Sequence, residues 1–141
     1  MDKKEKKPKA TSAGPQAGWA ISLEWLAQNN RSLAALAQGY LCPKCAKKLS
    51  AKRNKASPQA IIAAIRDCCS RSRDFINIQM PVLESIFRLF LTNGNQPLPL
   101  EELSRELNER RGGDVYRTSP EILLRLLKSD SYYGLQETKA E

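Results

Sequence analysis

Hydrophobic side chains recur three and four residues apart along most of this sequence, which is the spacing of helices that bury one face. The first such stretch covers residues 19–37 and is interrupted at Asn29-Asn30. It predicts two short helices, the second of them opening at Ser32 and ending before Gly39. Another helix is predicted to begin at Ser57-Pro58, because serine is a favoured N-cap and proline suits the first helical position. Its apolar face would consist of Ile61, Ile62, Ile65 and Cys69.

Three more helical patterns follow in the second half of the chain. One begins at Pro81 and ends at residues 93–95, and the next stops at Gly112-Gly113. The last begins at Ser119-Pro120 and is followed by residues 130–136, which are predicted to form a turn and a short strand. Three helices with short connections and a terminal strand favour a helix-turn-helix with a short β wing. The fold class is therefore predicted to be mainly α.

Composition divides the chain into four parts. Residues 1–18 are rich in lysine, proline, glycine and alanine and lack apolar periodicity, which predicts a disordered basic tail. Residues 19–79 would form a helical, cysteine-rich region stabilised by zinc, residues 80–136 a winged helix-turn-helix, and residues 137–141 a short tail. The 141 residues suffice for one ordinary domain or two small ones, and small domains tend to need a metal ion or disulfides.

All four cysteines lie between residues 42 and 69, and the chain has no histidine. Two residues separate Cys42 from Cys45, which lets a tight turn aim both sulfurs at one metal ion. Cys68 and Cys69 are adjacent, and neighbouring helical residues point about 100° apart, so both can bind one ion only if the helix ends there. The set predicts a four-cysteine zinc site. One alternative is that either Cys68 or Cys69 is a buried apolar cysteine and the metal has three protein ligands, or none. Another is two disulfides, which a reducing compartment disfavours.

A catalytic role for this zinc is disfavoured. Catalytic zinc keeps an open coordination position, and its chemistry usually needs a positioned acid or base. Asp67 is the single acidic residue among residues 42–73. A thiol redox pair is a minor alternative, because the strand-then-helix context of thioredoxin-like sites is missing. The sequence therefore favours a protein that is not an enzyme and has no small-molecule substrate.

Positive charge is concentrated around the cysteines. The chain has a formal net charge of +8, and residues 42–73 contain nine basic residues against one acidic residue, whereas residues 75–141 are net acidic. Four thiolates on a zinc ion would lower the charge of the cysteine region to about +6. Such a density is typical of a surface that binds nucleic-acid phosphates, although it also keeps a small protein in solution. The expected phosphate contacts are Lys47, Lys48, Lys52, Arg53, Lys55, Arg71 and Arg73.

Residues 93–103, followed by 119–130 and by Tyr133-Gly-Leu-Gln136, resemble winged-helix domains of the HARE-HTH kind, with LOTUS (OST-HTH) domains as the second choice. HARE-HTH domains are associated with DNA or transcription-complex binding, and LOTUS domains with RNA and protein partners. The resemblance covers about 55 residues and implies a third helix that enters a DNA groove. The basic residues placed to reach DNA would be Arg117, Arg125 and Lys128, although Glu121 lies four residues before Arg125 and can pair with it.

Together these patterns predict a cytoplasmic, zinc-binding protein that binds nucleic acid, DNA rather than RNA, in transcription or its regulation. No stretch approaches the roughly 18 apolar residues of a membrane span, and the first nine residues lack the apolar segment of a secretion signal. One alternative is a non-catalytic adaptor whose acidic winged helix docks on a polymerase, ribosomal or other protein partner. Another is an RNA-binding protein.

Overall fold

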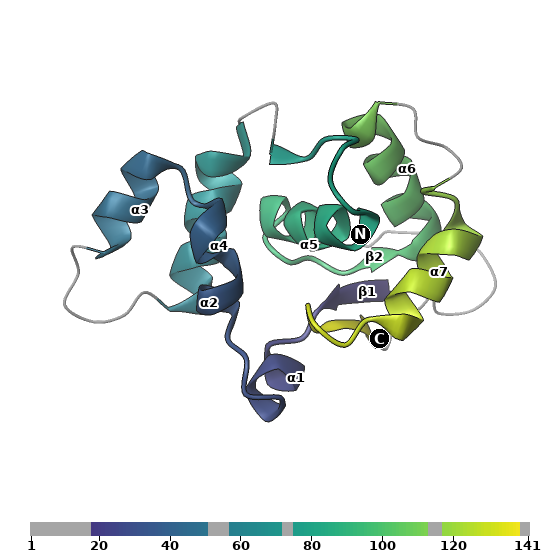
Figure 1. The fold of residues 1–141 in the computed structure, drawn as a ribbon, viewed down its shortest axis with the longest axis horizontal. Coiled ribbons are helices and arrows are strands. Elements are labelled where there is room, and N and C mark those ends of the chain that lie inside the picture. The colour runs from purple at the N-terminus through teal and green to yellow at the C-terminus, as the bar shows by residue number, and fades with distance from the viewer. Residues whose placement is uncertain (1–17, 51–56, 72–74, 113–116, 139–141) are drawn as a thin grey trace, which may run out of the picture.

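The computed structural model describes residues 18–50, 57–71, 75–112 and 117–138, and α-helices make up most of them (Figure 1). This confirms the prediction of a mainly helical chain. In order, the elements are β1 (Gly18–Ile21), α1 (Leu23–Gln28), α2 (Leu33–Ala37), the 3-10 helix η1 (Gln38–Tyr40), α3 (Pro43–Ser50), α4 (Pro58–Asp67), the 3-10 helix η2 (Cys69–Arg71), α5 (Val82–Thr92), β2 (Leu98–Pro99), α6 (Leu100–Arg111), α7 (Pro120–Ser129) and β3 (Leu135–Thr138).

Serine side chains begin several of these helices. The hydroxyl groups of Ser32, Ser57 and Ser119 each accept a hydrogen bond from the amide three residues later, at 3.0–3.4 Å. Proline follows two of these serines at the first helical position, where it loses no helical hydrogen bond. At the C-terminal end of α6, Gly112 adopts φ 85°, a left-handed conformation that glycine accommodates without strain. Local sequence signals therefore set these helix boundaries.

A small antiparallel sheet has the order β2-β1-β3, so the strand from the beginning of the described chain lies in the middle. Trp19 pairs with Leu98 of β2 on one side and with Glu137 of β3 on the other. The two short helices predicted for residues 19–37 are present, but residues 18–21 form a strand instead of the start of the first helix. All four of these residues are buried between β2 and β3, and backbone pairing on both edges outweighs their local preference.

Two polar side chains complete this sheet. The amide of Asn95 accepts from the backbone N–H of Ile21 and donates to its carbonyl, both at 2.9 Å, so it imitates a further pair of strand hydrogen bonds. The carboxylate of Asp130 accepts from the amides of Tyr132, Tyr133 and Leu135 at 3.0–3.1 Å. Asp130 thereby shapes the predicted turn before β3, a strand that also takes in residues 137–138, expected in the tail.

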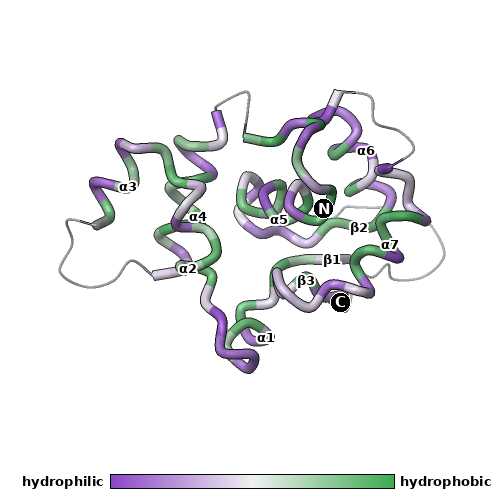
Figure 2. Tube along the Cα trace, viewed as in Figure 1, coloured by the Kyte–Doolittle hydropathy of each residue, from purple (hydrophilic) through white to green (hydrophobic). Residues whose placement is uncertain are grey.

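One hydrophobic core joins the cysteine-rich region to the second half of the chain. It runs from Trp19 to Leu135, includes Cys45 and Cys69, and is built around α5, whose Phe87 and Phe90 are fully buried. Helix α4 packs against both α2 and α5, while α3 lies at one edge of the molecule (Figure 1). In Figure 2, hydrophobic residues are prominent on α5, and hydrophilic residues are prominent on α3 and α6. The cysteine-containing and sheet-forming segments therefore stabilise each other.

Arg111 braces the segment that leads into α5. Its side chain is 3% exposed, and its guanidinium donates to the carbonyls of Ile78 and Met80 at 3.1 and 2.7 Å and to the hydroxyl of Ser85 at 2.8 Å. A buried charge is tolerated only when its polar partners replace water. The end of α6 is thus fixed to residues 78–85.

Candidate metal centre and nucleic-acid interface

The four cysteines form one compact cluster. Their Sγ atoms all lie within 4.8 Å of one another, and those of Cys42 and Cys68 are 3.9 Å apart. A tetrahedral ion with metal–sulfur bonds of about 2.3 Å needs sulfurs about 3.8 Å apart, so small adjustments suffice to close the site. All four are free thiols, and a disulfide would require about 2.05 Å between sulfurs. The cluster predicted from the sequence is therefore present and can hold a metal ion.

The sulfurs of the adjacent residues Cys68 and Cys69 can both reach the cluster because α4 ends just before them. The last residue of the helix is Asp67, and Cys68 has φ −136° and ψ −64°, outside the helical region. Cys69 then opens the 3-10 helix η2. The condition placed on this pair, that the helix must end there, is fulfilled.

The predicted turn at Cys42 and Cys45 is wrong in detail, because it is the beginning of α3. Pro43 is the first residue of this helix, and the carbonyl of Cys42 accepts the first helical hydrogen bond from Ala46 at 2.8 Å. Proline has no N–H to lose at that position, so a helix can begin directly after the first cysteine. The start of α3 and the end of α4 together supply the sulfurs.

Burial divides the cluster into two inner and two outer thiols. Cys45 and Cys69 are 8% and 4% exposed, whereas Cys42 and Cys68 are only half-buried. The backbone N–H of Cys42 donates to Sγ of Cys69 at 3.2 Å, a contact that stabilises negative charge on this sulfur. The inner sulfurs are anchored in the hydrophobic core, and the outer sulfurs complete the site from the surface.

Hydrogen bonds and burial shift the pKa values of Cys42, Cys45 and Cys69 in different directions. A hydrogen bond from the backbone N–H of Cys45 is the main reason that the pKa of Cys42 falls to about 7. The pKa of Cys45 rises to about 12 through its hydrogen bond with the Cys68 side chain and through burial, and burial raises the pKa of Cys69. The thiolate of Cys42 forms readily, whereas those of Cys45 and Cys69 would need a cation to compensate their charge.

Aromatic side chains attach this cluster to α5. Tyr40 lies two residues before Cys42, and its ring makes edge contacts with Phe75 and Phe87 at centroid distances of 6.4 and 6.0 Å. The guanidinium of Arg88 stacks over Tyr40 at 4.0 Å and donates to the carbonyl of Phe75 at 3.0 Å. Burial, followed by the nearby Glu84 carboxylate, raises the pKa of Tyr40 to about 12. The sequence patterns did not single out Tyr40 or Arg88, whose contact depends on packing across 48 residues of sequence.

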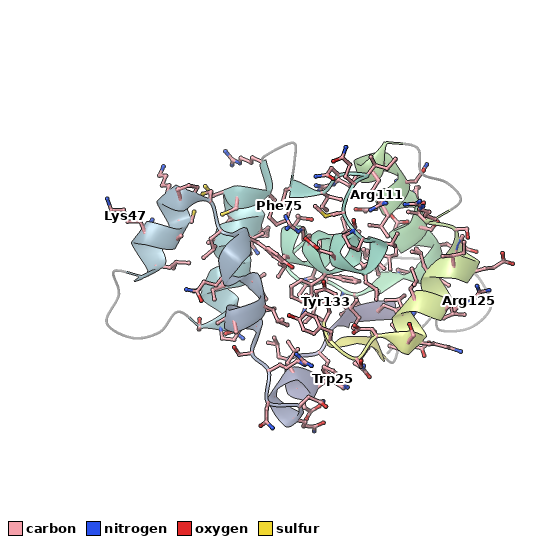
Figure 3. All side chains as sticks on the ribbon, in the orientation of Figure 1. Trp25, Lys47, Phe75, Arg111, Arg125 and Tyr133 are labelled. Carbon is pink, nitrogen blue, oxygen red and sulfur yellow. The ribbon has the colours of Figure 1, made fainter. Side chains whose placement is uncertain are left out.

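Exposed basic residues follow the cysteines closely in the sequence of α3 and η2. Lys44, Lys47 and Lys48 of α3 and Arg71 of η2 are exposed, and Lys47 lies at the outer edge of the molecule (Figure 3). Asp67 pairs with its neighbour Arg66 at 2.8 Å, and that hydrogen bond lowers its pKa. The predicted contacts Lys52, Arg53, Lys55 and Arg73 lie outside the described residues. Lys44 joins the predicted set because one helix turn separates it from Lys47 and Lys48.

The basic candidates of α7 form a separate group. Arg125 lies at the opposite end of the molecule from Lys47 (Figure 3), so the two groups cannot form one small patch. Arg117, Arg125 and Lys128 are all exposed, as is Glu121. Within the described part of the chain, no ion pair links Glu121 to Arg125.

In the described segments, no helix is both long and apolar enough to cross a membrane. Comparisons with protein-family models, curated proteins and solved structures find no match for this chain. The resemblance to HARE-HTH or LOTUS domains therefore stays a prediction.

Proposed function

We propose that the four cysteines hold a structural zinc ion and that the protein binds nucleic acid through the basic surface beside it. The observation that carries this proposal is the convergence of four sulfurs within 4.8 Å. The common centre of sulfurs so close together lies at most about 2.9 Å from each, which suits a single ion. Four thiolates and no free ligand position are typical of structural zinc, so the proposed role is not enzymatic.

Zinc in this position would orient α3. The ion would join the beginning of α3 to the end of α4, and Ile61, Ile62 and Ile65 of α4 are buried in the core. The exposed Lys44, Lys47 and Lys48 would then extend from a helix fixed at its N-terminal end. A helix so held presents its ammonium groups at a constant spacing to phosphates, with little dependence on base sequence.

The second half of the chain supports a winged helix as its architecture. The order α5, β2, α6, α7, β3 is compatible with a helix-turn-helix and its wing, and β1 takes the middle position in the sheet. Residues 112–119 connect α6 to α7, and the two helices pack against each other. This arrangement, together with exposed Arg125 and Lys128 on α7, favours duplex DNA as the ligand and a role in transcription.

Acidic residues on α6 support a second candidate function, docking on a protein partner. Arg105 forms ion pairs with Glu102 and Glu109 and lies 4.0 Å from Glu106, so several carboxylates gather around one cation. Excess negative charge there opposes contact with phosphates and suits a basic protein surface. In this adaptor, the basic residues of α3 would only assist.

Metal analysis of the purified full chain tests the zinc site directly. We expect about one zinc per chain, retained on gel filtration and released by a thiol-modifying reagent. A chain that purifies without metal and gains no stability from added zinc contradicts the structural role.

Two matched charge variants test the phosphate surface. Lys44→Gln/Lys47→Gln/Lys48→Gln neutralises α3, and Arg117→Gln/Arg125→Gln/Lys128→Gln neutralises the same number of charges around α7. Fluorescence anisotropy with labelled duplex DNA, single-stranded DNA and RNA over a salt series would compare them. We expect the α3 variant to reduce the salt slope by up to about 3 and to weaken binding of all sequences alike. Equal binding by the wild type and the α3 variant contradicts the proposal.

A further inference from the structure

The outer pair of sulfurs is arranged for chemistry of its own. Cys42 and Cys68 are half-buried, their Sγ atoms are 3.9 Å apart, and 25 residues separate them in the chain. The inner pair, Cys45 and Cys69, is 8% and 4% exposed and packs within the hydrophobic core. A small oxidant arriving from solvent therefore meets the outer sulfurs first.

We propose that Cys42 and Cys68 form a reversible disulfide when a peroxide oxidises the site, with release of the metal ion. This modification deepens the proposed function, because it concerns the same four thiolates. One outer thiolate attacks a peroxide oxygen, which gives a sulfenic acid and expels hydroxide. The second outer thiolate attacks that sulfur and displaces a second hydroxide. The two sulfurs lose two electrons, the peroxide gains them, and two protons convert both hydroxides to water.

The geometry favours this pairing over the others. Any bond that includes Cys45 or Cys69 would require the oxidised intermediate to be reached by a thiol that packs in the core. Cys68 and Cys69 are neighbours in sequence, and their disulfide would close a very small, strained ring. Closing the gap between Cys42 and Cys68 requires the sulfurs to approach by about 2 Å, within the reach of side-chain rotation.

Oxidation would exchange one link between α3 and α4 for another. With Cys42 and Cys68 bonded to each other, the metal keeps only Cys45 and Cys69, which is too few ligands for stable binding. The disulfide itself still joins the residue before α3 to the residue after α4. The formal charge of the site changes from −2, with zinc and four thiolates, to 0 once both inner thiols take up protons. The lysines of α3 then lie beside a neutral cluster.

Peroxide titration of the metal-loaded full chain tests this inference. A chromophoric chelator would follow zinc release, and non-reducing peptide mapping by mass spectrometry would identify the disulfides. We expect the Cys42–Cys68 cross-link to be at least about tenfold more abundant than any other, because the inner sulfurs are shielded. Dithiothreitol followed by zinc should restore the starting protein. A dominant Cys42–Cys45 or Cys68–Cys69 cross-link, or zinc release without a disulfide, overturns the inference.

The same mapping on reduced, metal-free protein separates this inference from the zinc proposal. If the purified chain binds no zinc but peroxide still joins Cys42 to Cys68, the zinc role fails and the pairing stands. If zinc is bound and another pair is oxidised, the pairing alone fails.

Discussion

Removing the side chain of Asn95 should destabilise the protein by disconnecting β1 from the segment before β2. Asn95→Gly is suitable because Asn95 adopts φ 62°, a left-handed conformation that glycine keeps without strain. The substitution deletes both 2.9 Å hydrogen bonds to the backbone of Ile21, which is 3% exposed. The N–H and carbonyl of Ile21 are left without these partners.

The expected loss follows from those two groups. Each backbone group left buried without a partner costs about 1–3 kcal/mol, so the loss of both partners should lower the free energy of unfolding by about 2–6 kcal/mol. Small domains are stable by only about 5–15 kcal/mol, which makes this a large fraction. Urea unfolding of the metal-loaded protein, followed by the fluorescence of Trp19 and Trp25, measures the change.

Asn93→Gly provides a matched control. The side chain of Asn93 also makes two hydrogen bonds with backbone: it accepts from the N–H of Gln96 at 3.0 Å and donates to the carbonyl of Gln96 at 3.1 Å. Both are local and exposed. Water can replace them, so the expected loss is below about 1 kcal/mol. If both variants unfold within 1 kcal/mol of each other, the reasoning about Asn95 as a substitute strand is refuted.

Three further predictions concern the turn before β3, the metal and Tyr40. Gly134→Ala should lower the free energy of unfolding in urea by about 1–3 kcal/mol, because Gly134 has φ 74° and a Cβ there would lie 2.9 Å from Cγ of Leu26. Unchanged stability would contradict this close contact. Zinc affinity, measured with a competing chelator, should rise at least about 100-fold per pH unit between pH 7.5 and 9, because zinc binding displaces at least two protons from Cys45 and Cys69, whose pKa values are raised. A zinc affinity that does not change with pH would argue against thiolate ligands. Absorbance at 295 nm should show the phenol of Tyr40 ionising near pH 12, and the Tyr40→Phe variant should lack this step. Because folding raises the pKa of Tyr40, its contribution to stability is complete below pH 10 and is lost as the pH rises through 12.

Features that depend on neighbouring residues could be predicted before the structure was known. Ser57-Pro58 and Ser119-Pro120 begin helices because a hydroxyl and a missing N–H act within one turn of the chain. The residue types also set the chemistry of the candidate site, since four cysteines without histidine allow only an all-thiolate set. Charge could likewise be assigned to segments, because it is a property of composition.

Features that depend on residues far apart in the chain became visible only in the folded protein. Gly18–Ile21 contains too few residues to distinguish strand from helix, and it becomes a strand by pairing with residues about 80 and 120 positions away. Arg111 is buried because carbonyls 31–34 residues earlier replace its water. The convergence of Cys68 and Cys69 on Cys42 required α4 to end after Asp67, beside the start of α3. Such long-range contacts leave no local pattern, since their free energy is gained only when the segments pack together.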